Sequence, residues 1–405
     1  MVAQPAPPPS PRPRRGEVAR RLASQLERAA KAFPAVVLTG PRRAGKTTLL
    51  RSLRPDADYR LLEEPDLVTQ IRTDPRSFME SLRTPVILDE VQNVPEIFPW
   101  VQARIDAAPS RRGRYFLTGS RDFSLMEGVS ESMTGRAAIL RLLPLSTQET
   151  PKVTMIDGGY PEVLRRPRDR SLWFASYLQT YVERDVRSIL AVRDLATFRR
   201  FLALLSTRHA QVLNRTDLAA PLGVSVPTIS QWLGILETTG VIALVHPWHD
   251  HAGKRLVKSP KVYFIDSGLA CHLLGIASDA DLRRSPFVGS VFEGFVAAEI
   301  LKAQVNAGRP PQLFWFRDRR GLEVDFVVPT PRGEAMLVEA KATRTVRPEF
   351  AAPMLRLATA MRGRGGRAPR CLVVHEGPAL ATRALSPGAE AVDLAGLLEV
   401  VGESR

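Results

Sequence analysis

The residues from Gly40 to Thr48 combine glycines, a lysine and two threonines in a spacing that suits phosphate binding. Glycines at the first and sixth positions let the backbone wrap so that successive N–H groups point at phosphate oxygens. A lysine directly after the second glycine can reach the β- and γ-phosphates, and the hydroxyl that follows can ligate Mg²⁺. The pattern predicts a nucleotide-binding loop formed by Gly40, Pro41, Arg42, Arg43, Ala44, Gly45, Lys46, Thr47 and Thr48.

The segment VILDE (86–90) places two acids at the end of an apolar run. Asp89 is positioned to hold Mg²⁺ through water, and Glu90 to orient or activate the attacking water. Taken alone, such a segment reads as a strand ending in two solvated acids, but the phosphate loop upstream favours the catalytic interpretation. Guanine recognition usually requires an Asn-Lys-x-Asp segment, which the sequence lacks. We therefore expect ATP and Mg²⁺ as cofactors.

A lysine near the C-terminus stands out because the chain is basic mainly through arginine. In LVEAKAT (337–343), Lys341 follows Glu339 by two residues in what reads as a strand. If 322–342 forms a hairpin centred on Arg332, Asp325 lies opposite Glu339 and Lys341 shares their face. Two such carboxylates repel unless a proton or a metal ion lies between them. The compact charge of lysine beside them suits a water or a phosphate oxygen.

The order Asp…Glu-x-Lys resembles the PD-(D/E)xK nuclease core. The resemblance implies a divalent ion held by Asp325 and Glu339, with Lys341 as a catalytic residue. It also implies a metal-binding glutamate from a preceding helix, for which Glu293 is the first candidate and Glu299 the second. Val324 departs from the proline of the family name. The alternative is a relic that keeps the fold without the activity, in which Lys341 only pairs with a neighbouring acid.

Longer matches extend over most of the chain. Seven segments resemble bacterial and archaeal AAA+ ATP-binding proteins with a C-terminal domain of unassigned function: GPRRAGKTTLL, VILDEVQ, FLTGSRDFSLM, GRAAILRLLPLS, GGYPEV, YVERDV and KRLVKSPKVYFIDSGL. The resemblance implies a polar sensor near the γ-phosphate, which falls on Thr118 with Ser120 as the alternate. It also implies an arginine that stabilises charge, in cis or in trans, for which Arg136 and Arg141 are the candidates. An arginine acting in trans requires a homo-oligomer. Either arginine is otherwise simply solvated.

These side chains need a scaffold of alternating strands and helices. The run AVVLT (35–39) is short and fully apolar, as in a buried parallel strand, and it leads directly into Gly40. Similar strands are predicted at 85–90 and 114–120, and 17–33 has helical spacing. The alternation predicts an α/β fold in which a parallel sheet with helices on both faces carries the phosphate loop.

Residues 214–245 predict a helix-turn-helix followed by a hairpin, a winged-helix arrangement with Gly223 at the turn. The second helix offers polar side chains that can hydrogen-bond to DNA, although the same face has no arginine or lysine. These side chains are Thr228, Ser230 and Gln231. The alternative is a plain packing module.

Composition narrows the class of protein. A net charge of +15 over 405 residues suits a polyanionic partner such as DNA, or else reflects arginines spread over solvated faces. Two cysteines are too few for a disulfide framework, which favours a cytoplasmic location. No apolar run approaches the ~20 residues that span a bilayer, so we expect no membrane segment. The histidines His246, His249 and His251 lie in a polar turn without a nearby cysteine, which disfavours zinc.

These features divide the chain into five predicted parts. They are a disordered proline-rich tail (1–16), an AAA+ P-loop ATPase domain (17–150), a helical lid (151–210), a winged-helix module (211–265) and a C-terminal PD-(D/E)xK-like domain (266–405). In the last part we expect a helix at 290–304 and strands at 313–317, 323–329, 335–341 and 371–375.

Overall fold

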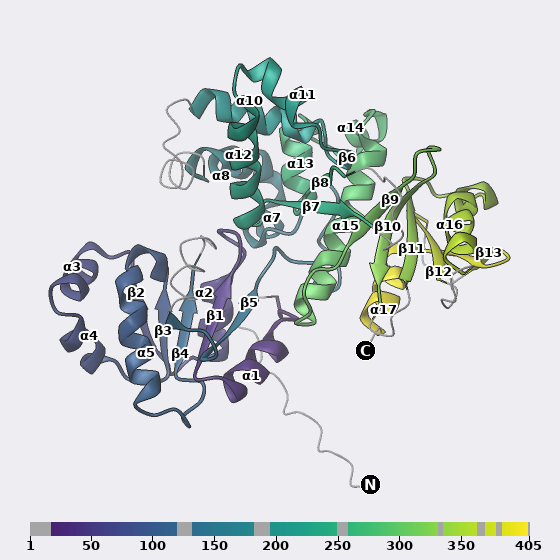
Figure 1. Ribbon diagram of the computed structural model, residues 1–405. Coiled ribbons are helices and arrows are strands. Elements are labelled where there is room, and N and C mark those ends of the chain that lie inside the picture. The colour runs from purple at the N-terminus through teal and green to yellow at the C-terminus, as the bar shows by residue number, and fades with distance from the viewer. Residues whose placement is uncertain are drawn as a thin grey trace, which may run out of the picture. The chain divides into compact units, whose positions relative to one another are not determined.

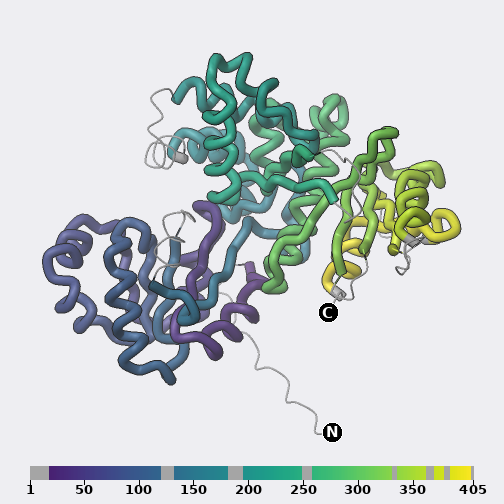
Figure 2. The backbone as a smooth tube through the Cα atoms, in the orientation of Figure 1, coloured from purple at the N-terminus to yellow at the C-terminus, as the bar shows by residue number. Residues whose placement is uncertain are grey.

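The computed structural model describes residues 18–119, 132–181, 195–248, 258–330, 335–362, 369–377 and 383–403. These residues form two compact units. The first unit runs to Leu142 and also contains Asn306–Gly308, and the second unit contains the remaining residues. Figure 1 labels their helices and strands, and Figure 2 follows the backbone from the purple N-terminal segment to the yellow C-terminal one.

The first unit is built on a five-stranded sheet with the order β2-β3-β4-β1-β5. All of its neighbouring strands are parallel. The strands are β1 (Ala35–Thr39), β2 (Asp58–Leu61), β3 (Val86–Asp89), β4 (Tyr115–Thr118) and β5 (Ala137–Arg141). This sheet confirms the predicted α/β class. The edge strands β2 and β5 were not predicted from the sequence. Both are only partly buried, and β2 (DYRL) has no apolar run.

Helices cover both faces of this sheet. One face packs against α1 (Ala23–Ala32) and α2 (Lys46–Leu53). The other face packs against α3 (Pro65–Thr73), α4 (Pro75–Ser81) and α5 (Phe98–Asp106), with the short turns η1 (Val91–Asn93) and η2 (Pro95–Ile97). Because both faces of the central strands are buried, AVVLT and VILD are apolar throughout instead of alternating.

The second unit begins with a helical region that has one shared core. Its elements are α7 (Pro161–Arg165), η3 (Pro167–Asp169), α8 (Arg170–Tyr181), α10 (Leu195–Ser206), α11 (Arg215–Ala219), η5 (Ala220–Leu222) and α12 (Val226–Thr238). Phe198 and Phe201 on α10 lie 5.2 Å and 5.1 Å from Trp232 on α12, measured between ring centroids. The described helices of the predicted lid (151–210) therefore share one core with α11 and α12.

The two helices predicted on either side of Gly223 are present as α11 with η5 and as α12. Gly223 adopts a left-handed conformation (φ 66°) after η5. Ser225 then caps α12 by accepting a hydrogen bond from the Thr228 N–H at 3.2 Å. No single helix among the described residues is long and apolar enough to cross a membrane. The pair Arg215–Leu222 and Val226–Thr238, bent by 110°, passes that test only together and only by length and composition.

The rest of the second unit is organised by a nine-stranded mixed sheet with the order β13-β14-β12-β11-β10-β9-β7-β8-β6. The strands are β6 (Gln211–Val212), β7 (Ile242–Pro247), β8 (Lys261–Phe264), β9 (Phe314–Arg317), β10 (Glu323–Pro329), β11 (Ala335–Lys341), β12 (Arg370–His375), β13 (Arg383–Ser386) and β14 (Ala389–Val392). Because β7 pairs with β9, the predicted boundary at residue 265 falls within one continuous sheet.

Helices lie on both faces of this second sheet as well. One face packs against α15 (Val288–Asn306) and α17 (Leu394–Glu403), and the other against α16 (Ala352–Arg362). Three shorter elements complete the unit: α13 (Ser267–Leu273), α14 (Asp279–Arg284) and η6 (Pro348–Ala351). The β10–β11 pairing runs from Phe326↔Val338 to Pro329↔Ala335, which is the register predicted for a hairpin centred on Arg332. The turn itself (331–334) lies outside the described residues.

Candidate functional site

The predicted phosphate loop connects β1 to α2. Gly40 (φ 134°) and Gly45 (φ 97°) adopt backbone angles that other residues rarely take. A Cβ atom at Gly40 would also lie only 2.1 Å from the carbonyl oxygen of Leu142, so glycine is required there by packing as well. Helix α2 begins at Lys46, so its free N–H groups and positive dipole end are directed towards the loop.

Lys46 is buried inside this loop. Its Nζ donates hydrogen bonds to the carbonyl oxygens of Gly40 at 2.9 Å and Pro41 at 3.1 Å. Arg20, which precedes α1, donates to the carbonyl oxygen of Ala44 at 2.7 Å. Sequence reasoning missed Arg20 because it belongs to no motif. The loop thus holds a buried ammonium group at the position where the sequence predicts phosphates.

Asp89 is buried at the end of β3 and binds three hydroxyl groups. Its Oδ2 accepts hydrogen bonds from Thr47 Oγ1 at 2.8 Å and from the Tyr59 hydroxyl at 2.7 Å. Its Oδ1 accepts one from Thr118 Oγ1. The structure therefore brings together Thr47 and Asp89, the two residues expected to bind Mg²⁺. A hydroxyl and a carboxylate are hard oxygen ligands that fit this ion.

Tyr59 on β2 was not identified from the sequence. Burial, followed by the hydrogen bond to Asp89 and the negative charge of that carboxylate, raises the pKa of Tyr59 well above its ordinary value. The phenol therefore stays protonated and remains a donor to Asp89. Its strand has no sequence signature of its own, so only the β2–β3 pairing shows that Tyr59 and Asp89 are neighbours.

Glu90 and Thr118 lie beside this network. Glu90 has a left-handed backbone (φ 58°), which is unusual for a residue other than glycine and is typical of functional turns. Its N–H donates to Thr118 Oγ1 at 3.1 Å, and its carboxylate accepts a hydrogen bond from Gln92. Thr118 is fully buried, with its hydroxyl bound to Asp89 and to the Glu90 backbone. Its hydroxyl positions these two acids, and its role near the γ-phosphate stays a prediction. The alternate residue, Ser120, lies outside the described residues.

The two candidate arginines lie at opposite ends of β5. Arg136 is level with the start of β1, since its carbonyl oxygen accepts from the Ala35 N–H at 3.3 Å. Its guanidinium binds Asp106 at 2.6 Å and 2.9 Å. Because β1 rises about 13 Å between its first and last residues, Arg136 cannot reach a nucleotide in its own chain. Arg141 lies opposite Thr39 in the β1–β5 register, directly before the loop. It is therefore the better candidate in cis.

The predicted C-terminal residues gather around a second cluster in the second unit. Lys261 on β8 is only 3% exposed. Its Nζ lies 3.0 Å from Glu293 Oε1 on α15, 2.8 Å from Glu323 Oε1 on β10 and 3.8 Å from Asp325 Oδ1. Burial lowers the pKa of Lys261, but the charges of the three carboxylates raise it more, so the ammonium form is kept. Sequence reasoning did not identify Lys261 or Glu323.

Glu339 and Lys341 adjoin this cluster. The Nζ of Lys341 donates to Glu339 Oε1 at 2.7 Å, as in the alternative in which the lysine only forms a salt bridge. Asp325 Oδ2 accepts a hydrogen bond from the Ala340 N–H at 2.9 Å, which ties the β10 and β11 carboxylates together. Burial, and then the negative charge of Asp325, raise the pKa values of both Glu293 and Glu339 above their ordinary range.

The metal set of Glu293, Asp325 and Glu339 stays a prediction: Glu293 and Asp325 lie beside Lys261, and Glu339 lies beside Lys341. Across the ranges that the structure describes, no group of three or more His, Cys, Asp or Glu side chains is arranged to hold a metal ion. The Lys261 ammonium lies between the carboxylates of Glu293, Glu323 and Asp325. The second helix candidate, Glu299, is fully buried elsewhere and accepts hydrogen bonds from Thr147. Of the three histidines considered for zinc, His246 lies in β7, and the other two fall outside the described residues.

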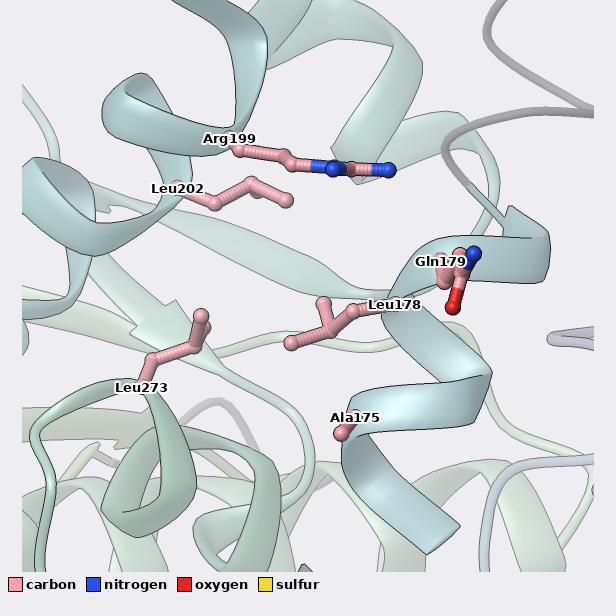
Figure 3. Close-up of a pocket in the computed structure, with 6 residues that line it drawn as sticks. All are labelled: Ala175, Leu178, Gln179, Arg199, Leu202 and Leu273. Atoms are coloured by element: carbon pink, nitrogen blue, oxygen red, sulfur yellow. The ribbon is translucent and has the colours of Figure 1, made fainter. Parts of the chain in front are cut away.

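A hollow of about 360 Å³ lies between α8, α10 and α13 (Figure 3). Leu178, Leu202 and Leu273 point into it, and Arg199 and Gln179 extend along its side. None of the residues predicted from the sequence lines this hollow.

Three family models match successive parts of the chain. Residues 32–150 match an AAA domain, the domain that contains the phosphate loop, Asp89 and Thr118. Residues 148–280 match a domain of unknown function, DUF8612, and residues 288–385 match another, DUF4143. The AAA match coincides with the parallel sheet of the first unit, and the DUF4143 match covers most of the second sheet.

Relatives and solved structures were also found. An uncharacterized protein of Mycobacterium tuberculosis and one of Mycobacterium bovis are each 32% identical over 316 residues, which is 76% of this chain and 70% of theirs. The Walker-type ATPase of Pyrococcus abyssi is 16% identical, with 65% of this chain and 98% of that chain covered and a TM-score of 0.44. The RuvB Holliday junction branch migration motor of Thermotoga maritima is 18% identical, with 56% and 90% covered and a TM-score of 0.31. Both TM-scores are below 0.5, so neither structure is evidence about the overall fold. The motifs, the AAA match and the mycobacterial relatives agree, and the chain belongs to a family of AAA-type P-loop ATPases with a C-terminal DUF4143 domain.

Proposed function

We propose that the first unit hydrolyses ATP with Mg²⁺ held at Thr47 and Asp89. The observation that supports this most directly is the hydrogen bond of 2.8 Å between these two side chains, next to the buried ammonium of Lys46. When bound, the ion supplies positive charge to the phosphate oxygens as negative charge develops on them. Lys46 adds a second positive charge at the loop. Tyr59 and Thr118 hold the Asp89 carboxylate in place through their hydroxyl groups.

Glu90 is proposed to orient or deprotonate the attacking water. It follows Asp89 directly and has a strained backbone, and its N–H is fixed by Thr118. This arrangement directs the chain sharply after β3, so that two neighbouring acids take different roles. Asp89 is buried and fully hydrogen-bonded, whereas Glu90 is only half-buried and can meet a water molecule.

Two pairs of variants test these roles. Lys46→Ala should abolish binding of a labelled ATP analogue, whereas Lys152→Ala, at an exposed lysine in the second unit, should leave it unchanged. Glu90→Gln should bind the analogue normally but lower kcat by about a hundredfold or more, because general base catalysis typically contributes 10²–10⁴-fold. The matched control is the exposed Glu80→Gln. Unchanged affinity in Lys46→Ala, or unchanged turnover in Glu90→Gln, would contradict the assignment.

We further propose that the second unit couples ATP hydrolysis to binding of nucleic acid, without cleaving it. The net charge of +15 over the whole chain, with the exposed Ser230 and Gln231 on α12 of the second unit, supports binding to a polyanion. The pairing of Lys341 with Glu339 and the position of Lys261 between the other carboxylates favour binding over cleavage. Of the two roles that the sequence leaves open for the C-terminal domain, the non-cleaving one is thus better supported.

The test combines a binding and a cutting assay. Fluorescence anisotropy with single-stranded, duplex and branched DNA should show binding that weakens as salt increases, since phosphate contacts release counterions. Wild type, Asp325→Ala and Lys341→Arg should all leave these DNAs intact in Mg²⁺ or Mn²⁺. Cleavage by the wild type that both substitutions reduce would instead establish a nuclease. Absence of DNA binding at low salt, with and without ATP, would refute the nucleic-acid partner.

A further inference from the structure

Lys261 is a buried positive charge that two other chain segments surround with three carboxylates. It is contributed by β8, and its acidic neighbours come from α15 (Glu293) and β10 (Glu323 and Asp325). The indole of Trp315 on β9 covers the ammonium, with the ring centroid 5.3 Å from Nζ. A buried charge is stable only when paired and hydrogen-bonded, and this one meets both conditions.

The carboxylates are oriented by this ammonium and by fixed donors around it. Glu293 Oε1 accepts hydrogen bonds from Lys261 at 3.0 Å and from the Tyr263 hydroxyl at 2.6 Å. Asp325 directs its other oxygen, Oδ2, to the Ala340 N–H. Tyr263 is fully buried, so its phenol holds Glu293 in one orientation. These carboxylates therefore converge on the ammonium nitrogen.

Spacing and charge both exclude a second cation from this position. Mg²⁺ requires oxygen ligands at about 2.0–2.1 Å and Ca²⁺ at about 2.3–2.6 Å, whereas the Glu293 and Glu323 oxygens lie at hydrogen-bond distances from Nζ. A divalent ion at the centre of the carboxylates would overlap the ammonium and be repelled by it. A planar guanidinium is larger, and the compact point charge of lysine suits a small cage.

We propose that Lys261 is the resident cation of this cluster, that it occupies the place of a divalent metal ion, and that removing its charge turns the cluster into a site for Mn²⁺ or Mg²⁺. The proposal is independent of the ATPase assignment, because every residue involved lies in the second unit. It accounts for the gathering of acids in a domain that does not present them as a metal site.

The experiment measures Mn²⁺ binding to the full chain without nucleotide, using electron paramagnetic resonance to detect free Mn²⁺. Lys261→Met keeps most of the side-chain length and removes the charge. It should gain one equivalent of bound Mn²⁺, with an affinity about tenfold or more above that of the wild type, because carboxylate oxygens suit this ion. The double variant Lys261→Met/Asp325→Asn should lose the gained site. Weak binding at Thr47 and Asp89 is common to all these proteins and cancels in the comparison.

A matched control uses a second buried lysine. Lys302 pairs with a single carboxylate, Glu299, so Lys302→Met should not create a Mn²⁺ site. Wild-type protein that binds Mn²⁺ in a manner abolished by Asp325→Asn would overturn the proposal. So would a folded Lys261→Met protein that gains no site. If Lys261→Met is unfolded without metal, refolding on addition of Mn²⁺ supports the proposal. If Mn²⁺ stabilises neither Lys261→Met nor the milder Lys261→Gln, the proposal is overturned.

Discussion

Glu299 and Lys302 form an ion pair inside the second unit, about one turn apart on α15. Their side chains are 0% and 2% exposed, and the two charged groups lie 2.9 Å apart. The pair also binds the segment that follows the first unit. Glu299 Oε2 accepts from the N–H and the hydroxyl of Thr147 at 2.7 Å and 2.6 Å, and Lys302 donates to the carbonyl oxygen of Leu145 at 3.1 Å. The connection after Leu142 is therefore fixed to α15 by two buried charges.

Lys302→Met should destabilise this unit far more than removal of both charges. The single substitution leaves the Glu299 carboxylate buried without a counter-charge, which typically costs about 3–5 kcal/mol. The double variant Glu299→Gln/Lys302→Met removes both charges and keeps an amide oxygen for the Thr147 donors. Its expected cost is that of one lost hydrogen bond, about 1 kcal/mol. Adding the second substitution should thus restore roughly 2–4 kcal/mol, the difference between these two costs.

The assay is equilibrium urea unfolding followed by tryptophan fluorescence. Trp315 is fully buried in the hydrophobic core that includes α15, so it reports on this unit. Lys152→Met, at an exposed lysine, is the matched control and should stay within about 0.5 kcal/mol of the wild type. A Lys302→Met protein as stable as the control would refute the reasoning. So would a double variant no more stable than Lys302→Met.

Three further predictions concern single side chains. Tyr59→Phe removes a hydrogen bond to Asp89. The Mg²⁺ concentration for half-maximal ATPase activity should therefore rise about fivefold, the equivalent of about 1 kcal/mol. An unchanged Mg²⁺ titration would contradict the positioning role. Arg141→Ala should lower kcat at every protein concentration. Arg136→Ala should lower kcat only at concentrations where the protein is oligomeric. The opposite pattern across a dilution series would exchange their roles. Burial lowers the pKa of His209 to about 4, so the unfolded chain binds its proton more readily than the folded chain. The stability due to His209 is present above its ordinary pKa and is lost as pH falls towards 4, by about 2 kcal/mol between pH 7.5 and 5. Urea unfolding of wild type and His209→Asn at both pH values isolates this loss, and identical pH dependence in the two proteins would exclude it.

The phosphate loop and the central strands could be predicted from sequence because their determinants are local. Gly40, Gly45 and Lys46 lie in one short segment, and their spacing fixes the backbone path and the start of α2. The strands β1 and β3 are buried on both faces, so each forms an unbroken apolar run. The β10–β11 register follows from the centre of a single turn, which sets Asp325 opposite Glu339. In each case the residues that interact are close in sequence, or lie at equal distances on either side of one turn.

The partners of these residues were decided by tertiary structure. Tyr59 reaches Asp89 only because β2 pairs with β3, and β2 is an edge strand without an apolar signature. Thr118 ends β4, and the pairing of β3 with β4 places its hydroxyl between Asp89 and Glu90. Arg136 and Arg141 are close in sequence, yet they lie at opposite ends of β5. Strand order and direction determine these placements, and local spacing does not encode them.

The lysines show the same division. The chain has eight lysines among its 57 lysine and arginine residues, so a lysine is an unusual choice in this sequence. Among the lysines that the structure describes, Lys46, Lys261 and Lys302 are buried, where a compact ammonium fits a small cage of oxygens better than a planar guanidinium does. The scarcity of lysine therefore led to the prediction that Lys46 and Lys341 have chemical roles. Only the folded chain brings the Lys261 side chain from β8 to the carboxylates of α15 and β10, because these three segments are far apart in the sequence.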